Sequence, residues 1–231
     1  MQNYRSHFER RSMSSHLIYH PQRVRTAFNG VTVYHDQTHG NQDPYIWNDP
    51  FLHTFCHMPE LRAPGPGEIN FWISGDSLQG FKHLCCDLVF VIKEKLYWPK
   101  ANSINRNDQI VDSKEAFHDH YQWAWQHRFE KKRRFTLKAN SALSFQYQDR
   151  TGSLINIIPI LNDLGFSTAY LRKALKKNGR SKPMRLDLRI ARELHSAIST
   201  AADFKLSAKR LQSIRKDHPE LASQSKRIKR C

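Results

Sequence analysis

The stretch LCCDLVFVIK, from Leu84 to Lys93, is the strongest strand signal in the chain. It is rich in β-branched residues and almost continuously apolar, which is typical of a strand buried on both faces. The stretch INFWIS, from Ile69 to Ser74, leaves a turn rich in Pro and Gly and predicts a second strand. We therefore expect both segments to belong to one β-rich core.

Three further segments alternate between apolar and polar residues and predict shorter strands. They are residues 31–33, residues 134–138 and residues 142–147. Turns rich in Gly, Pro and Asn separate these segments, and several short strands in this arrangement are typical of a small barrel or a curled sheet.

The pattern becomes helical after Asn162. Ser167 is a good N-cap for a helix that continues to Lys177 and ends before Gly179. Apolar residues then recur at every fourth position, which places them on one helical face: Leu186, Ile190, Leu194 and Ile198. Residues 207–216 predict a basic helix. The fold class that we expect is α+β, a small mixed β-barrel with a helical, basic C-terminal extension.

These changes of pattern divide the chain into four parts. Residues 1–27 mix Arg, His and Ser without periodicity, so we expect a basic flexible arm. Residues 28–161 are expected to form the barrel core, residues 162–202 helices that pack on it, and residues 203–231 a basic helical tail. Hydrophobic residues make up 39% of the 231, which is too many for a disordered chain.

The charge of the chain points to a polyanionic partner. It has 37 Lys and Arg residues against 21 Asp and Glu residues, a formal net charge of +16, and such an excess favours nucleic acid, DNA or RNA. No apolar run approaches the roughly 20 residues that span a bilayer, and the N-terminus lacks the apolar segment of a signal peptide. We therefore expect no membrane partner and an intracellular location, cytoplasmic or associated with the nucleoid.

Lys and Arg residues gather in four clusters in the second half of the chain. Such clusters neutralise phosphates and release counterions, which gives affinity without sequence preference. Any single cluster is better explained as a solvated face, and only their number favours nucleic acid. The residues that we expect to contact a nucleic-acid backbone are Lys131, Lys132, Arg133, Arg134, Arg172, Lys173, Lys176 and Lys177.

Aromatic residues are frequent in the first half of the chain and suggest where a base could be held. Aromatic faces stack on bases, and two or three rings can enclose a flipped or modified base. We expect most of the rings to lie in the core. The candidates for a base pocket are Phe71, Trp72, Ser74, Trp98 and Trp123.

Catalytic chemistry has one candidate cluster, His118, Asp119 and His120, whose side chains are of the types that bind metals. The His and Cys spacings match no standard zinc pattern, and the nucleobase-deaminase signature is absent. Phosphate-binding loops and the nucleophile elbow are also absent. We therefore expect no bound metal and no cofactor, and a binding protein rather than an enzyme. The alternative is a metal-dependent nuclease or base-modifying enzyme.

The order of several short motifs resembles the PUA-like group of small β-barrels, in particular the nucleotide-modification-associated domain families, which are related to EVE, ASCH and YTH domains. The motifs are Asn48 to Phe51, Cys56 to Pro59 with Leu61 and Arg62, Gly67 and Glu68 leading into Phe71 to Gly75, and Leu84 to Glu94 followed by Leu96, Tyr97 and Trp98. The resemblance covers roughly residues 31–198. It implies a PUA-like barrel with a pocket for a base, used to sense or help process modified nucleic acid.

Residues 154–177 also resemble a helix-turn-helix, with a turn at Gly165. In a DNA-binding motif of this kind, the second helix would bring its N-terminal residues to the major groove: Ser167, Thr168, Tyr170, Arg172 and Lys173. Pro159 argues against an unbroken first helix.

The leading hypothesis is a nucleic-acid-binding protein that accommodates a base, modified or unmodified, in an aromatic pocket and is linked to nucleic-acid modification. The alternatives are the metal-dependent enzyme and a helix-turn-helix regulator that binds DNA. A third interpretation is a component of a larger nucleoprotein assembly, in which the basic arm and tail become ordered.

Overall fold

The computed structural model of the chain describes residues 14–21, 24–35, 52–54, 65–76, 80–97, 135–177 and 180–217. The strands are β1 (Ser14–Pro21), β2 (Val24–Phe28), β3 (Val31–His35), β4 (Leu52–Thr54), β5 (Ile69–Gly75), β6 (Leu84–Tyr97), β7 (Phe135–Ala139), β8 (Phe145–Gln148), β9 (Ile155–Asn156), β10 (Lys176–Lys177), β11 (Arg180–Ser181), β12 (Met184–Asp187) and β13 (Phe204–Ser207). The helices are α2 (Ile158–Asp163), α3 (Thr168–Ala174), α4 (Leu188–Ala201) and α5 (Ala208–Asp217). The expected α+β class is confirmed.

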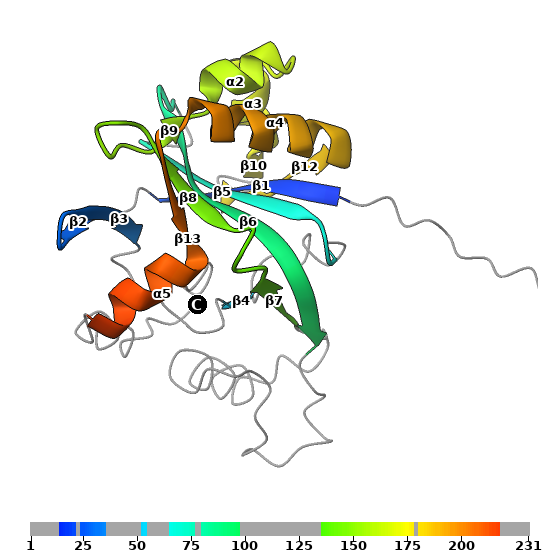
Figure 1. Ribbon diagram of the computed structural model, residues 1–231. Coiled ribbons are helices and arrows are strands. Elements are labelled where there is room, and N and C mark those ends of the chain that lie inside the picture. Colours follow the sequence, from blue (N-terminus) through cyan, green and yellow to red (C-terminus); the bar gives the residue numbers. More distant parts are fainter. Residues whose placement is uncertain are drawn as a thin grey trace, which may run out of the picture.

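A nine-stranded sheet organises the described residues (Figure 1). Its main path runs β12-β1-β5-β6-β7-β4, while β8 and β9 pair with β6, and β13 pairs with β8. Strands β1 and β5 are parallel, and the other pairs in this sheet are antiparallel. The path ends at β12 and β4, so the described strands form an open sheet and not the closed barrel that we expected.

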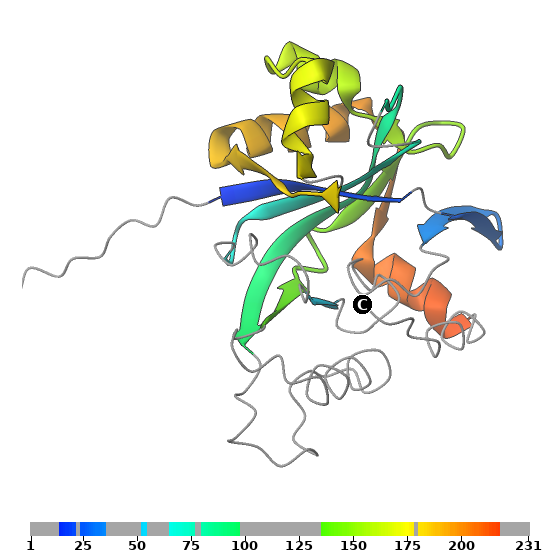
Figure 2. The same cartoon turned by 180° about the vertical axis from the view of Figure 1, so that it is seen from behind.

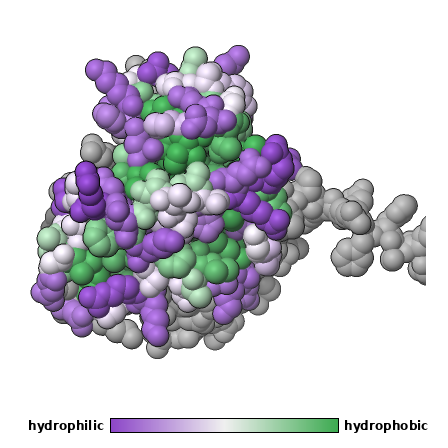
Figure 3. All heavy atoms as spheres, turned by 45° about the horizontal axis from the view of Figure 1, so that its top comes forward, coloured by the Kyte–Doolittle hydropathy of each residue, from purple (hydrophilic) through white to green (hydrophobic). Residues whose placement is uncertain are grey.

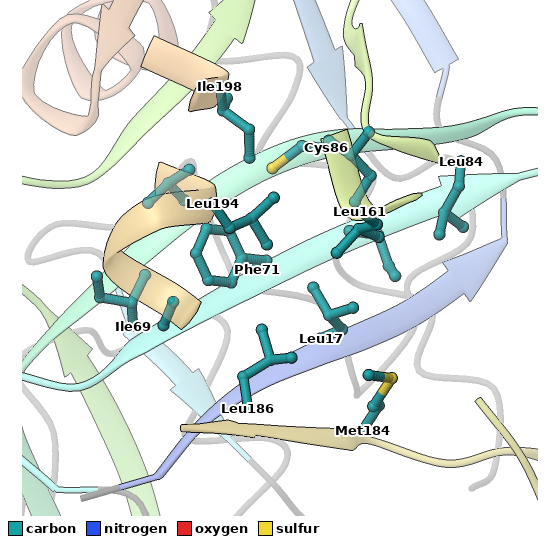
Figure 4. Packing of buried hydrophobic residues seen from close by; sticks show 14 of the residues in the cluster. Leu17, Ile69, Phe71, Leu84, Cys86, Leu161, Met184, Leu186, Leu194 and Ile198 are labelled. Atoms are coloured by element: carbon teal, nitrogen blue, oxygen red, sulfur yellow. The ribbon is translucent and has the colours of Figure 1, made fainter. Parts of the chain in front are cut away.

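The two predicted central strands are both present. Their side chains point alternately to the two faces of the sheet and belong to two separate hydrophobic cores. All seven residues of β5 are buried. On one face, Phe71 and its neighbours pack under α2, α3 and α4, which we call the helix face (Figures 1 and 4). On the other, Trp72 and Phe90 pack with residues of α5 and of the β2–β3 hairpin, which we call the hairpin face (Figure 2).

The helices follow the sequence pattern closely but begin and end at different residues. In α4, Asp187 is the N-cap and accepts a hydrogen bond from the Ile190 amide at 2.9 Å. Ile190, Leu194 and Ile198 are buried on one face, as predicted, whereas Leu186 belongs to strand β12 because the chain stays extended up to the N-cap. Residues 208–217 form α5, so a helix is present where the basic helix was predicted.

Residues 14–21 were expected to lie in a flexible arm, and this prediction is wrong. They form β1, which pairs with β12 on one side and with β5 on the other. Leu17 and Ile18 are 0% exposed, one on each face of the sheet. A strand held between two partners gains its order from contacts distant in sequence, which a search for local periodicity does not detect.

The connection between β5 and β6 depends on close backbone packing at Gly75. A Cβ atom at Gly75 would lie 2.4 Å from the carbonyl oxygen of His83, a distance that no side chain tolerates without a backbone shift. The Gly75 carbonyl also accepts a hydrogen bond from the Tyr19 hydroxyl at 3.0 Å. Glycine at this position therefore lets the loop before β6 turn back against the end of β5.

Candidate functional site

Three residues form a row across the hairpin face of the sheet. His16 on β1 is paired with Arg185 on β12 and with Asn70 on β5. Residues directly opposite each other on neighbouring strands project their side chains to the same face. That face is the one that carries Ile18 and Trp72, because these residues lie two positions further along β1 and β5. The row thus leads from the edge strand β12 to the centre of the sheet.

The inner two members of the row are buried polar side chains that lack hydrogen-bond partners. Asn70 is 0% exposed, and neither its Nδ2 nor its Oδ1 atom has a partner. His16 is 4% exposed, and its Nδ1 atom also has none. Buried polar groups in folded proteins are bonded in the great majority of cases, because leaving one unpaired costs about 1–3 kcal/mol. The two side chains lie close enough for the Asn70 amide to act as a hydrogen-bonding group toward the His16 ring, although the standard geometry is not met.

The electrostatic surroundings keep His16 neutral. Its pKa is lowered from 6.5 to about 4, mainly by burial and then by the positive charge of Arg185, while a hydrogen bond with the Asn70 side chain acts in the opposite direction. A neutral imidazole has one N–H donor and one nitrogen acceptor. Together with the Asn70 amide, the pair therefore offers both donors and acceptors within a buried and uncharged environment.

The predicted base pocket is not assembled in the described residues. Phe71 and Trp72 are both 0% exposed and lie on opposite faces of β5, so they cannot line one pocket. Figure 4 shows Phe71 among the apolar side chains of the helix face. Ser74 is on the Trp72 side, where its hydroxyl donates to the buried Asp87 carboxylate at 2.6 Å. The other two candidates, Trp98 and Trp123, lie outside the described residues.

The predicted backbone-binding cations are only partly described. Lys131, Lys132, Arg133 and Arg134 lie outside the described residues. Lys173 on α3 is exposed and Lys176 on β10 is half-buried, and Lys177 follows on β10. The three residues follow one another within five positions of the chain, at the end of α3 and in β10.

Arg172 is bound to the protein itself. Its guanidinium donates from Nη2 to the Phe81 carbonyl at 3.0 Å and lies 5.5 Å from the centre of the Phe81 ring. The interaction ties α3 to the loop before β6 and is the kind of cation–π contact that stabilises a fold. The prediction that Arg172 contacts phosphate has no support from this geometry.

The helix-turn-helix interpretation is matched only in outline. Helix α2 begins at Ile158 with Pro159 in its first turn, where proline is tolerated, and residues 154–157 are not helical. The Ser167 hydroxyl caps α3 by accepting from the Tyr170 amide, but α3 ends at Ala174. Leu171 packs into the helix-face core. Helices α2 and α3 therefore cover the helix face of the sheet. Figure 3 shows hydrophilic residues mixed with hydrophobic patches on this side of the molecule.

The remaining chemical candidates do not form a reactive site in the part of the chain that the structure describes. His118, Asp119 and His120 lie outside it, and within it no three His, Cys, Asp or Glu residues are grouped so as to hold a metal ion. Burial raises the pKa of Cys85 to about 11 and that of Cys86 well above its usual range. Both thiols are therefore protonated at neutral pH and are poor nucleophiles.

One more polar network escaped prediction from the sequence. The Tyr147 hydroxyl on β8 and His195 Nε2 on α4 lie 2.8 Å apart, and Lys205 on β13 donates to the Ser199 hydroxyl at 2.7 Å. Burial lowers the pKa of His195, and the charge of Lys205 adds to this effect. The network joins α4 to the strands beneath it and is explained by that structural role.

No family model, no curated protein and no solved structure matches this chain. The fold and the residues of the row are therefore the basis for a functional proposal. Among the described helices, none combines the length and the apolar character needed to cross a membrane.

Proposed function

We propose that this chain is a nucleic-acid-binding protein that accommodates a base, modified or unmodified, at the hairpin face of its sheet and serves nucleic-acid modification. The observation that carries the proposal is the fully buried Asn70 amide, whose polar atoms form no hydrogen bond of standard geometry, although the amide acts as a hydrogen-bonding group toward the neighbouring His16 ring. Asparagine amides pair with the edges of bases because both present a donor next to an acceptor in one plane. The Asn70 amide is 0% exposed, so a base would reach it only where the side chains that cover it move aside.

The charge of the chain supports the same proposal. A net charge of +16 is unfavourable for a compact protein on its own and is offset when phosphates are bound. Exposed cations occur on several described elements, among them Lys173 on α3, Arg185 on β12 and Lys209 on α5. The phosphate chain would be held by such residues, together with Lys131 to Arg134, while the base enters the sheet face.

The resemblance to PUA-like families belongs to this proposal as well. In those families a small β-structure presents a pocket for a base, and the motifs that carry the resemblance here include β5 and β6, the central strands of the sheet. An open sheet with a base-binding face is the form that we propose for this chain. Aromatic side chains beside Asn70, namely Trp72 and Phe90, would provide the apolar surroundings of the base.

The test is a binding titration with fluorescent single-stranded and double-stranded oligonucleotides, made of DNA and of RNA, at 50 and 200 mM salt. We expect binding that weakens at least tenfold over this range, because each phosphate contact contributes to the salt dependence. Changing Lys131, Lys132, Arg133 and Arg134 together to Ala should weaken binding and reduce the salt dependence.

The control has the same net charge as that variant but removes exposed cations elsewhere: Lys82, Lys93, Arg150 and Arg192 to Ala. If both variants lose affinity equally, the cations act through net charge and form no defined surface. Absence of binding to all four kinds of oligonucleotide, or binding that does not respond to salt, would overturn the proposed function.

A further inference from the structure

We infer that helix α3 carries a stacking surface for an unpaired base of single-stranded nucleic acid, in which Tyr170 contacts the base and Lys173 contacts an adjoining phosphate. The inference rests on the proposed function for the class of ligand, and it adds a contact on the other side of the sheet from the hairpin face. It follows from an exposed aromatic ring that lies within a segment rich in cations and free of acids.

Tyr170 presents an aromatic side chain to solvent. It is 52% exposed, and among the large hydrophobic residues that the structure describes, only Leu143 and Phe204 have a comparable exposure. An exposed ring forgoes the stabilisation that burial provides. A base stacked on the ring would cover it, and every base has a flat face suited to this contact.

Phe166 supports the Tyr170 ring from the protein side. Phe166 is partly buried and packs against the helix-face core. The centres of the two rings lie 5.9 Å apart, and their planes are inclined by 34°. This contact restricts the Tyr170 ring before a ligand arrives, so less side-chain entropy is lost when a base binds.

Helix α3 is a firmly anchored support for this ring. Leu171 and Leu175 are both 0% exposed in the helix-face core. The Arg172 guanidinium donates to the Phe81 carbonyl at 3.0 Å, and the Lys182 amide donates to the Leu175 carbonyl at 2.8 Å. The helix therefore presents its opposite side to solvent, and it lies with α2 at one end of the described structure (Figures 1 and 2).

The charge of this part of the chain is complementary to phosphate. Residues 164–186 contain no Asp and no Glu, and Asp163 and Asp187 border the segment. Asp187 is occupied as the N-cap of α4. The cations of the segment are Arg172, Lys173, Lys176, Lys177, Arg180, Lys182 and Arg185. A segment of this composition attracts a polyanion along its whole length.

Lys173 is the cation best placed to act together with Tyr170. It follows Tyr170 by three positions on α3, and residues three apart are neighbours on a helix surface. Its side chain is exposed and forms no ion pair with another described residue. Its ammonium group is therefore available to a phosphate next to a base that stacks on Tyr170.

This pair of side chains favours a single strand over a duplex. In a duplex, neighbouring bases cover the faces of each base, whereas an unpaired base can turn its face toward an aromatic ring. Each nucleotide of a single strand offers one base face and one phosphate, which matches a ring beside a cation. Reading of a duplex groove by α3 has less support, because Leu171 and Arg172 are already used to hold the helix in place.

The experiment measures binding of the full chain to fluorescent oligothymidylate and oligouridylate, to a strand of equal length without bases, and to a duplex. Tyr170→Leu should weaken binding to the two intact single strands about tenfold, because a base loses its stacking partner. Binding to the strand without bases should stay unchanged. Tyr170→Phe, which keeps the ring, should bind as the unaltered protein does. The control is Leu143→Ala, which removes an apolar side chain of similar exposure, 50%, and should have no effect.

Lys173→Gln tests the cation separately. It should weaken binding to the intact strand and to the strand without bases by the same factor, because both contain the phosphates. It should also lower the slope of the logarithm of affinity against the logarithm of salt concentration by about one. Lys93→Gln, which removes an exposed cation on β6, is the matched control and should change affinity less.

The results separate this inference from the proposed function. If single strands bind with the expected salt dependence but Tyr170→Leu binds them unchanged, or loses the intact strand and the strand without bases equally, the inference is overturned and the proposed function stands. If no oligonucleotide binds the unaltered protein, the proposed function itself fails. If Tyr170→Leu alters the molecular mass found by light scattering and leaves nucleic-acid binding unchanged, the ring is a contact between copies of the chain and the inference is overturned.

Discussion

Acidification should destabilise this protein through His16, and the size of the effect follows from its environment. The ring is 4% exposed and lies beside Arg185, and its pKa is lowered from 6.5 to about 4. One pKa unit corresponds to about 1.4 kcal/mol. The interval from 6.5 to 4 is therefore worth roughly 3 kcal/mol of unfolding free energy, a large part of the stability of a small domain.

The direction follows from comparing proton binding in the two states. Above pH 6.5 the ring is neutral in both the folded and the unfolded chain, so His16 has no effect on the pH dependence. Between pH 6.5 and 4 the unfolded chain binds a proton that the folded protein does not, and the stability falls. Below about pH 4 both states are protonated at His16 and the loss from this residue is complete.

The assay is urea unfolding at pH 7, 6, 5 and 4.5, with the unaltered protein and His16→Gln compared at each pH. We expect the unaltered protein to lose roughly 2 kcal/mol more than the variant between pH 7 and 5. The comparison cancels other groups, including His195, whose pKa is lowered as well. His83→Gln, which changes an exposed histidine, is the control and should follow the unaltered protein. Parallel curves for the unaltered protein and His16→Gln would refute the reasoning.

Three further predictions concern single residues. Asn70→Leu should raise the free energy of unfolding by about 1–2 kcal/mol, because it removes an unpaired buried amide, whereas the exposed Asn162→Leu should not; urea unfolding at pH 7 measures both. Gly75→Ala should cost about 1–3 kcal/mol because the new Cβ meets a carbonyl oxygen at 2.4 Å, and Gly80→Ala, which meets nothing within 4 Å, should be nearly neutral in the same assay. Cys85, whose pKa is raised to about 11, should resist iodoacetamide at pH 8 until urea unfolds the chain, as peptide mapping by mass spectrometry would reveal; rapid labelling of the folded protein would contradict the raised pKa.

The strands and helices that could be predicted are those whose signal is local. Strands β5 and β6 are strongly apolar, and the burial of Ile190, Leu194 and Ile198 on α4 follows from their spacing alone. Strand β1 could not be found in this way, because its apolar run is short and its order comes from β5 and β12. The short apolar run Leu17-Ile18-Tyr19 was the available signal.

The candidate site was harder to predict than the fold. Phe71 and Trp72 were both assigned to one pocket, although consecutive residues of a strand point to opposite faces. Arg172 was grouped with the phosphate-binding cations, and only its contact with Phe81 separates it from them. Asn70 could not be singled out from the sequence, because an asparagine between two apolar residues does not indicate whether its amide forms hydrogen bonds in the folded protein.

The order of residues along the chain by itself determined the α+β class, the two central strands, the buried face of α4 and the net positive charge. These properties depend on composition and on spacing over a few residues, where backbone geometry dictates which side chains share a face. Only the tertiary structure decided that the described sheet stays open, that β1 lies inside it, and that Arg185, His16 and Asn70 stand in one row. The reason is physical: pairing between strands distant in sequence sets the register, and the register alone brings an exposed cation beside two buried polar groups.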